Sequence, residues 1–204
     1  AGSQAHIIER MLDKGRAFYN LTDQLEFGPI DAEHLATWID DRMTNAGVKA
    51  QGVGAAIVAA AGPRTRDVVQ VARQCFDNSR GEGAASLASV SIAFDDVVAE
   101  QEAVFHANWH GLTALKQNVL RAVALGVGGL TTAESIATFG LTSSGAASHS
   151  ASALVEAGHL VKVRGTPGYT YENPFFRRWV ETETAADLGR GATQAPSSDT
   201  SKQQ

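Results

Sequence analysis

Several features that would assign this chain to a common class of protein are missing from its sequence. It contains one cysteine, Cys75, which excludes an intrachain disulfide framework. No run of residues is long and apolar enough to span a membrane, and no signal-peptide pattern opens the chain. These absences favour a reducing, cytoplasmic setting and no membrane partner. Cys75 itself lies in an apolar helical stripe, which predicts a buried thiol.

Motifs for common enzyme chemistry are also missing. The sequence has no G-x-x-x-x-G-K-[ST] loop to cradle phosphates, and no apolar strand ends in paired acidic residues that would hold Mg²⁺. It has no G-x-S-x-G or S-x-x-K pattern. His106 and His110 share a helix face, but no cysteine or carboxylate pair completes a tetrahedral set around them. We therefore predict no catalytic residue and no metal ligand in this chain.

The chain also lacks a basic balance, with 17 Lys and Arg against 22 Asp and Glu. This argues against a protein that wraps nucleic acid over much of its surface. The charge is uneven, because residues 1–109 carry nine basic against fifteen acidic residues, whereas residues 110–178 carry six against three. The basic segment is where nucleic-acid contact would be expected.

Helical periodicity dominates what is present. Amphipathic spacing predicts helices over residues 1–15, 32–47, 50–61 and 64–77, with Asp31 as the N-cap of the second. The small, polar residues 77–90 predict a loose linker, and a helix from Phe94 towards Trp109 is expected to bridge to the next domain.

Residues 112–178 are the most informative part of the chain. Helical runs at 112–126, 131–140 and 142–161 are followed by a hairpin pattern, KVRGTPGYTYE, and by NPFFRRWV. Three short helices followed by a small β-wing are typical of a winged helix-turn-helix. The predicted fold is therefore mainly α, with a helical N-terminal bundle followed by a winged helix-turn-helix with a small β-wing.

A winged helix binds either DNA or a partner protein, and both remain open here. The residues predicted to be exposed on the third helix are Ser143, Ser144, Ser148, His149, Ser150 and Ser152. None is a Lys or Arg, which base and phosphate contacts favour. The DNA interpretation rests on Lys162 and Arg164 in the wing, with Lys116 and Arg121.

The order of these motifs resembles the C-terminal part of the archaeal-type AAA+/STAND P-loop ATPases. LTALKQNVLRAVALG, TTAESIATFG, the third helix and the ending Asn173-Pro174-x-Phe176-x-x-Trp179 are similar to that family's winged helix. GSQAHIIERMLDKGRAFYN, LEFGPIDAEHLATWIDDRM and AAGPRTRDVVQVARQCF are similar to the end of its ATPase core and its helical lid. The resemblance covers roughly residues 1–180.

The resemblance implies a nucleotide-switched protein whose phosphate-binding core is missing from this chain. It implies a lid-like domain at 1–90, with the end of the core at 1–30, a connecting helix at 91–110 and a winged helix at 111–182. The tail at 183–204 has almost no large apolar residue, which predicts that it is disordered. It also implies ATP and Mg²⁺ in the parent protein and none in this chain. Arg64, with Arg66 as second choice, matches the nucleotide-sensing lid position, and Ser3 matches a polar sensor in the core.

One alternative comes from a different functional class. The chain would then be a free-standing winged-helix transcriptional regulator with a helical dimerisation domain. Either interpretation allows a homo-oligomer, because the apolar faces predicted near the N-terminus need a partner.

Overall fold

A computed structural model describes residues 28–163 and 165–193, with side chains described as far as Ala185. In these residues the chain is mainly helical with one two-stranded antiparallel sheet, as the sequence predicts. The elements are α2 (Ala32–Asn45), α3 (Val53–Ala61), α4 (Thr65–Ser79), α5 (Leu87–Glu100), α6 (Glu102–His110), α7 (Ala114–Ala124), α8 (Ala133–Phe139), α9 (Ser144–Glu156), β1 (Leu160–Lys162), β2 (Tyr169–Tyr171) and α10 (Pro174–Thr193). The helix predicted over residues 1–15 lies outside the described residues.

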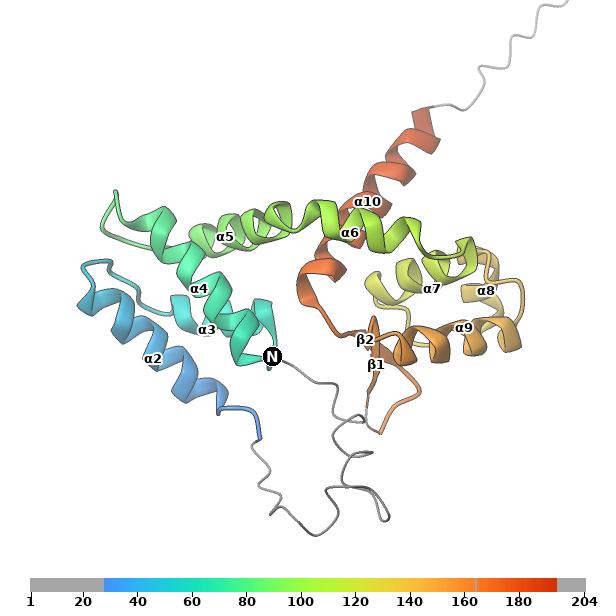
Figure 1. Cartoon of the computed structure of the whole chain (residues 1–204), viewed down its shortest axis with the longest axis horizontal. Coiled ribbons are helices and arrows are strands. Elements are labelled where there is room, and N and C mark those ends of the chain that lie inside the picture. The colour runs from blue at the N-terminus through green and yellow to red at the C-terminus, as the bar shows by residue number, and fades with distance from the viewer. Residues whose placement is uncertain (1–27, 164, 194–204) are drawn as a thin grey trace, which may run out of the picture.

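Helices α2 to α5 pack together, and we call them the helical bundle (Figure 1). Each helix buries apolar residues spaced three or four apart, which is the period that places them on one face. The buried residues include Leu35, Ile39, Met43, Val53, Ile57, Val68, Val71, Cys75, Val90, Ala93 and Val97. The predicted burial of the Cys75 thiol is confirmed, and burial raises its pKa.

The contact between α2 and α3 depends on a carboxylate and a glycine. Asp40 of α2 accepts hydrogen bonds from the backbone amides of Gly52, at 2.8 Å, and Gly54, at 2.6 Å. These amides have no acceptor within their own helix, so Asp40 caps the N-terminus of α3 from outside. Gly54 lies directly against the backbone of Ala36, where a side chain would collide. Helices α2 and α3 can therefore pack this closely only because residue 54 has no side chain.

The linker predicted at residues 77–90 is wrong at both of its ends, which are helical. Helix α4 continues to Ser79 and α5 begins at Leu87, after a capping box formed by Ser86 and Ser89. The residues between them are also held, because Lys49 exchanges backbone hydrogen bonds with Gly83 and Ala85, at 2.9 and 2.8 Å. The small residues of this segment form a short, paired connection and a helix start.

The boundary predicted between residues 90 and 91 falls inside α5. This helix packs along α4 and belongs to the helical bundle, so residues 91–100 are not part of a connecting helix. The helical backbone is interrupted at Gln101, between α5 and α6. The connection to α7 is therefore α6 alone (Figure 1). At the other end, α10 continues to Thr193, into the tail 183–204 that we predict to be disordered. No helix in the described part of the chain is long and apolar enough to cross a membrane.

Helices α7 to α10 and the strands β1 and β2 form the second half of the fold, which we call the C-terminal unit. Its core contains Val119, Leu120, Leu141, Leu154, Leu160 and Phe176, all buried. The buried Tyr171 hydroxyl of β2 donates a 2.7 Å hydrogen bond to the Leu120 carbonyl of α7. Helix α10 closes this core and also reaches the bundle, where the rings of Phe175 and Phe94 lie 5.0 Å apart.

Candidate functional site

The sequence predicts that the third helix of the C-terminal unit carries the binding face, and α9 does present a distinct exposed face. Ser144, Ser148 and Ser152 are exposed and recur every four residues, with His149 exposed beside them. Residues that alternate with them, including Ala147, Ala151 and Leu154, are buried against the core. Ser150 is also buried, because its position falls on the core side of the helix, so its predicted exposure is wrong.

The start of α9 is shaped by the turn that follows α8. Ser143 is its N-cap and accepts a hydrogen bond from the amide of Ala146, at 3.2 Å. Gly140 ends α8 in the left-handed conformation, with φ of 61°. Thr142 also has a positive φ, 65°, and around it the Ser143 amide bonds to the Leu141 carbonyl at 2.7 Å. A β-branched residue rarely adopts this conformation, so the turn that presents Ser143 is strained.

The hairpin beside α9 carries the second part of the predicted face. Strands β1 and β2 pair antiparallel, with Val161 opposite Thr170 and Lys162 opposite Tyr169. Lys162 is exposed, and so are Val161 and Val163. Arg164 lies outside the described residues. The described part of the hairpin therefore presents a lysine between two valines.

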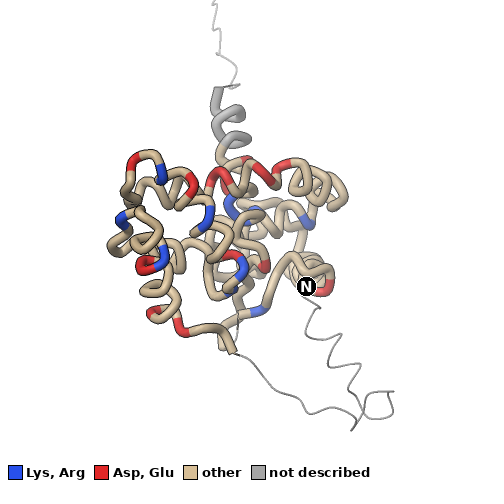
Figure 2. The backbone as a smooth tube through the Cα atoms, turned by 60° about the vertical axis from the view of Figure 1, so that its left-hand side comes forward, with Lys and Arg blue, Asp and Glu red and all other residues tan. Residues whose placement is uncertain are grey.

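Of the described basic residues of the C-terminal unit, Lys162 lies on the hairpin beside α9, and the arginines are engaged elsewhere. Arg178 pairs with Asp95 of the bundle, and Arg177 pairs with Glu181 along α10, with shortest distances of 3.0 and 2.8 Å. Arg121 stacks over the ring of Trp109 at 5.1 Å. Lys116 is half-buried. Figure 2 shows basic and acidic residues interspersed along the tube. The positive balance that the sequence shows for residues 110–178 is therefore not a basic patch on α9.

The two arginines predicted to sense nucleotide lie at the start of α4, around one buried carboxylate. Asp67 is 1% exposed. Arg66 reaches its Oδ1 with Nε at 3.1 Å and Nη2 at 3.0 Å. Arg64 Nε lies 3.1 Å from Oδ2, although this ion pair lacks hydrogen-bond alignment. The sequence shows Asp67 three residues after Arg64, but its burial between both arginines comes from the packing of α4.

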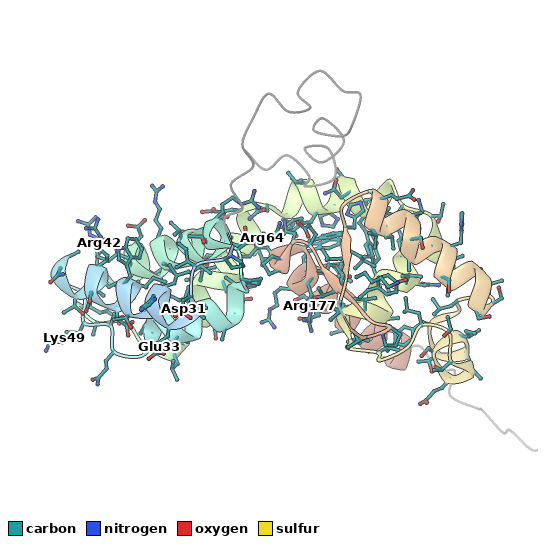
Figure 3. All side chains as sticks on the ribbon, turned by 90° about the horizontal axis from the view of Figure 1, so that it is seen from below. Asp31, Glu33, Arg42, Lys49, Arg64 and Arg177 are labelled. Carbon is teal, nitrogen blue, oxygen red and sulfur yellow. The ribbon has the colours of Figure 1, made fainter. Side chains whose placement is uncertain are left out.

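Arg64 also bonds across the boundary between the two halves of the fold. Its Nη1 donates a 2.7 Å hydrogen bond to Glu172, which follows β2. Figure 3 shows Arg64 between the helical bundle and the C-terminal unit. Sequence reasoning missed Glu172 because 108 residues separate it from Arg64. Ser3, the third predicted sensing residue, lies outside the described residues.

A cleft of about 640 Å³ lies at the same boundary. Its apolar lining includes Ala60 of α3, Phe94 of α5 and Pro174 of α10. Its charged lining consists of Arg64, Arg177, Arg178, Asp95, Glu172 and Glu181. Three positive and three negative side chains balance, so the cleft has no net charge with which to attract an ion.

The histidines form no metal centre in the described part of the chain, where no group of three or more potential ligands comes together. His106 and His110 stack with ring centroids 6.0 Å apart, and His106 lies against Trp179. His159 is half-buried against Phe176, and its burial, followed by the nearby charge of Lys116, lowers its pKa. These rings have packing contacts that account for their positions.

Comparison with models of protein families, with curated proteins and with solved structures finds no match to this chain. The function must therefore be argued from the exposed face of α9 and from the boundary around Arg64.

Proposed function

We propose that this chain is the lid and winged-helix part of a nucleotide-switched P-loop ATPase, and that its winged helix binds a partner protein. The order α7, α8, α9, β1, β2 supports a winged helix-turn-helix, with α9 as its recognition helix and β1–β2 as its wing. The helical bundle that precedes it supports a lid. ATP and Mg²⁺ would be held by the core of the parent protein, in the cytoplasm.

The observation that carries the choice of a protein partner is that the exposed face of α9 has no Lys or Arg, and that its one charged residue, Glu156, is acidic. A helix that reads DNA needs donors for base edges and cations for phosphates, and release of counterions by those cations supplies much of the affinity. Ser144, Ser148, His149 and Ser152 supply no permanent positive charge. Arg177 and Arg178, on α10, are held by carboxylates. Short polar side chains suit a protein surface better than a phosphate backbone.

A titration with duplex DNA tests this choice. We expect no saturable binding to a random duplex of about 30 base pairs at micromolar protein and about 50 mM salt, measured by fluorescence anisotropy. The affinities of two matched variants for the duplex are compared, Ser148→Arg on α9 and Gln74→Arg on α4. Each variant adds one positive charge. Tight binding by the unaltered chain, with affinity falling steeply between about 50 and 200 mM salt, would show that the winged helix is a DNA-binding element.

The protein partner is tested by photo-crosslinking in cells that express the chain. A crosslinking amino acid at the position of Ser148 should give a discrete adduct, and one at the exposed Arg73 of α4 should not. The same adduct at both positions, or none at Ser148, would contradict partner binding through α9.

The parent architecture is tested by the reading frame upstream of Ala1. A Walker A motif there supports the ATPase, whereas an initiator methionine immediately before Ala1 supports the free-standing regulator with a helical dimerisation domain.

Nucleotide sensing by Arg64 or Arg66 remains part of the proposal. A cation at this position would have to exchange a carboxylate for a phosphate, because both guanidinium groups contact Asp67. Arg64 is the better candidate, since its Nη2 is buried without a hydrogen-bond partner among the described residues.

A further inference from the structure

The two halves of the fold meet at one packed contact and one open one. The packed contact joins α5 and α10, where the Phe94 and Phe175 rings touch and Arg178 binds both oxygens of Asp95 at 3.0 and 3.4 Å. The open contact is the cleft, across which Arg64 reaches Glu172. Both contacts line the cleft, so among the described residues two ion pairs cross the boundary there. Arg178–Asp95 lies beside the packed rings, and Arg64–Glu172 lies at the start of α4.

Arg64 can leave Glu172 without exposing a buried charge. Glu172 is 42% exposed, so water solvates its carboxylate when the pair separates. Asp67 is buried, but Arg66 contacts it independently, so movement of Arg64 leaves that carboxylate with a cation. The usual cost of separating a buried ion pair, an uncompensated charge in the interior, is avoided here.

We propose that the Arg64–Glu172 ion pair is a latch that holds the C-terminal unit closed against the helical bundle, with the Phe94–Phe175 contact as the hinge. Closing the latch brings β2 towards the start of α4, and opening it widens the cleft. An exposed pair of this kind changes a two-state equilibrium by about twofold to fivefold, and salt screens it. The latch sets how often the two halves separate.

If Arg64 senses nucleotide, the latch would couple that sensing to movement of the C-terminal unit. This step rests on the proposed function. An anion that recruited the guanidinium of Arg64 would release Glu172 and with it the C-terminal unit. The two carboxylates that Arg64 already contacts make it a shared cation between the lid and the winged helix. Nucleotide state in the parent protein would then alter the position of α9.

A distance measurement between the two halves tests the latch. Spin labels on Asn45→Cys of α2 and Ser152→Cys of α9 occupy exposed positions, and the native Cys75 is fully buried. Double electron–electron resonance on the full chain should give one main distance at low salt. Glu172→Gln should raise the ratio of a second, longer distance by about twofold to fivefold, and about 1 M salt should do the same in the unaltered chain.

Two further variants decide whether the effect belongs to this pair. Asp77→Asn removes the exposed Arg73–Asp77 pair within α4 and should leave the distances unchanged. Arg64→Gln together with Glu172→Gln should give the same distances as Glu172→Gln alone, because the other ion pair of Arg64, with Asp67, lies at the start of α4 and does not cross the boundary. The latch is refuted if Glu172→Gln leaves the distances as in the unaltered chain, or if Asp77→Asn shifts them equally. DNA binding or its absence does not bear on this result.

Discussion

Replacing Tyr171 by phenylalanine should lower stability at neutral pH and raise relative stability in alkali. Tyr171 is 7% exposed, and its hydroxyl donates the 2.7 Å hydrogen bond that joins β2 to α7. Phenylalanine keeps the ring packing and removes this bond. Because the Leu120 carbonyl lies within helix α7, the expected loss is that of one net hydrogen bond, about 1 kcal/mol of the free energy of unfolding at pH 7.

In alkali, Tyr171→Phe should raise the free energy of unfolding relative to the unaltered chain. Burial, followed by the charge of Glu181, raises the pKa of Tyr171 well above 10.0, so the folded state keeps a proton that the unfolded state releases. Stability from this group is present below the unfolded pKa and is lost as pH rises above it. At one pH unit above that value the unaltered chain has lost about 1.4 kcal/mol through Tyr171. The two stability curves should therefore approach each other above pH 10 and cross in strong alkali.

Urea unfolding at pH 7.5 and between pH 9.5 and 11, followed by circular dichroism, measures both effects. All other alkaline titrations are common to the two chains and cancel in the difference. Tyr169→Phe, on the same strand but half-buried, is the control and should show neither the loss nor the crossing. A stability difference between the unaltered chain and Tyr171→Phe that stays constant with pH would refute the burial of the Tyr171 hydroxyl.

Three other substitutions test separate parts of the fold by the same unfolding measurement. Because burial lowers the folded-state pKa of His159 from 6.5, the unaltered chain should lose stability as pH falls below that value, and His159→Gln should reduce this loss. Gly54→Ala should cost about 3 kcal/mol through collision with the Ala36 backbone, whereas Gly145→Ala on α9, which has open space, should gain about 0.5 kcal/mol; equal effects would contradict the close helix contact. Thr142→Gly should raise stability by about 1 kcal/mol by relieving its positive φ, and a loss would show that the turn is unstrained.

Much of the local structure followed from short-range patterns. Asp31 caps α2 as predicted, with its side chain accepting bonds from the amides of Glu33 and His34, and these bonds lower its pKa. Gly158, which follows α9, has a positive φ of 77°, a conformation that glycine adopts readily at the end of a helix. Such features depend on residues within one helical turn, whose spacing is visible in the sequence.

The candidate face of α9 was only partly predictable. Ser143, Ser144, Ser148, His149 and Ser152 were expected at the exposed surface and lie there, with Ser143 as the N-cap of α9. The positions of the basic residues were not predictable, because the direction of Arg177 and Arg178 depends on how α10 packs on the bundle and on the core. The sequence gives the number of these charges, but the fold determines which carboxylates pair with them.

The sequence by itself determined the helical character, the helix caps, the antiparallel hairpin and the burial of Cys75, because each follows from local spacing and apolar periodicity. The tertiary structure alone decided that α5 belongs to the bundle, that Asp67 is buried between Arg64 and Arg66, and that Arg64 reaches Glu172 across a cleft. Contacts between residues far apart in the chain depend on the angles at which helices pack, and no local pattern records those angles.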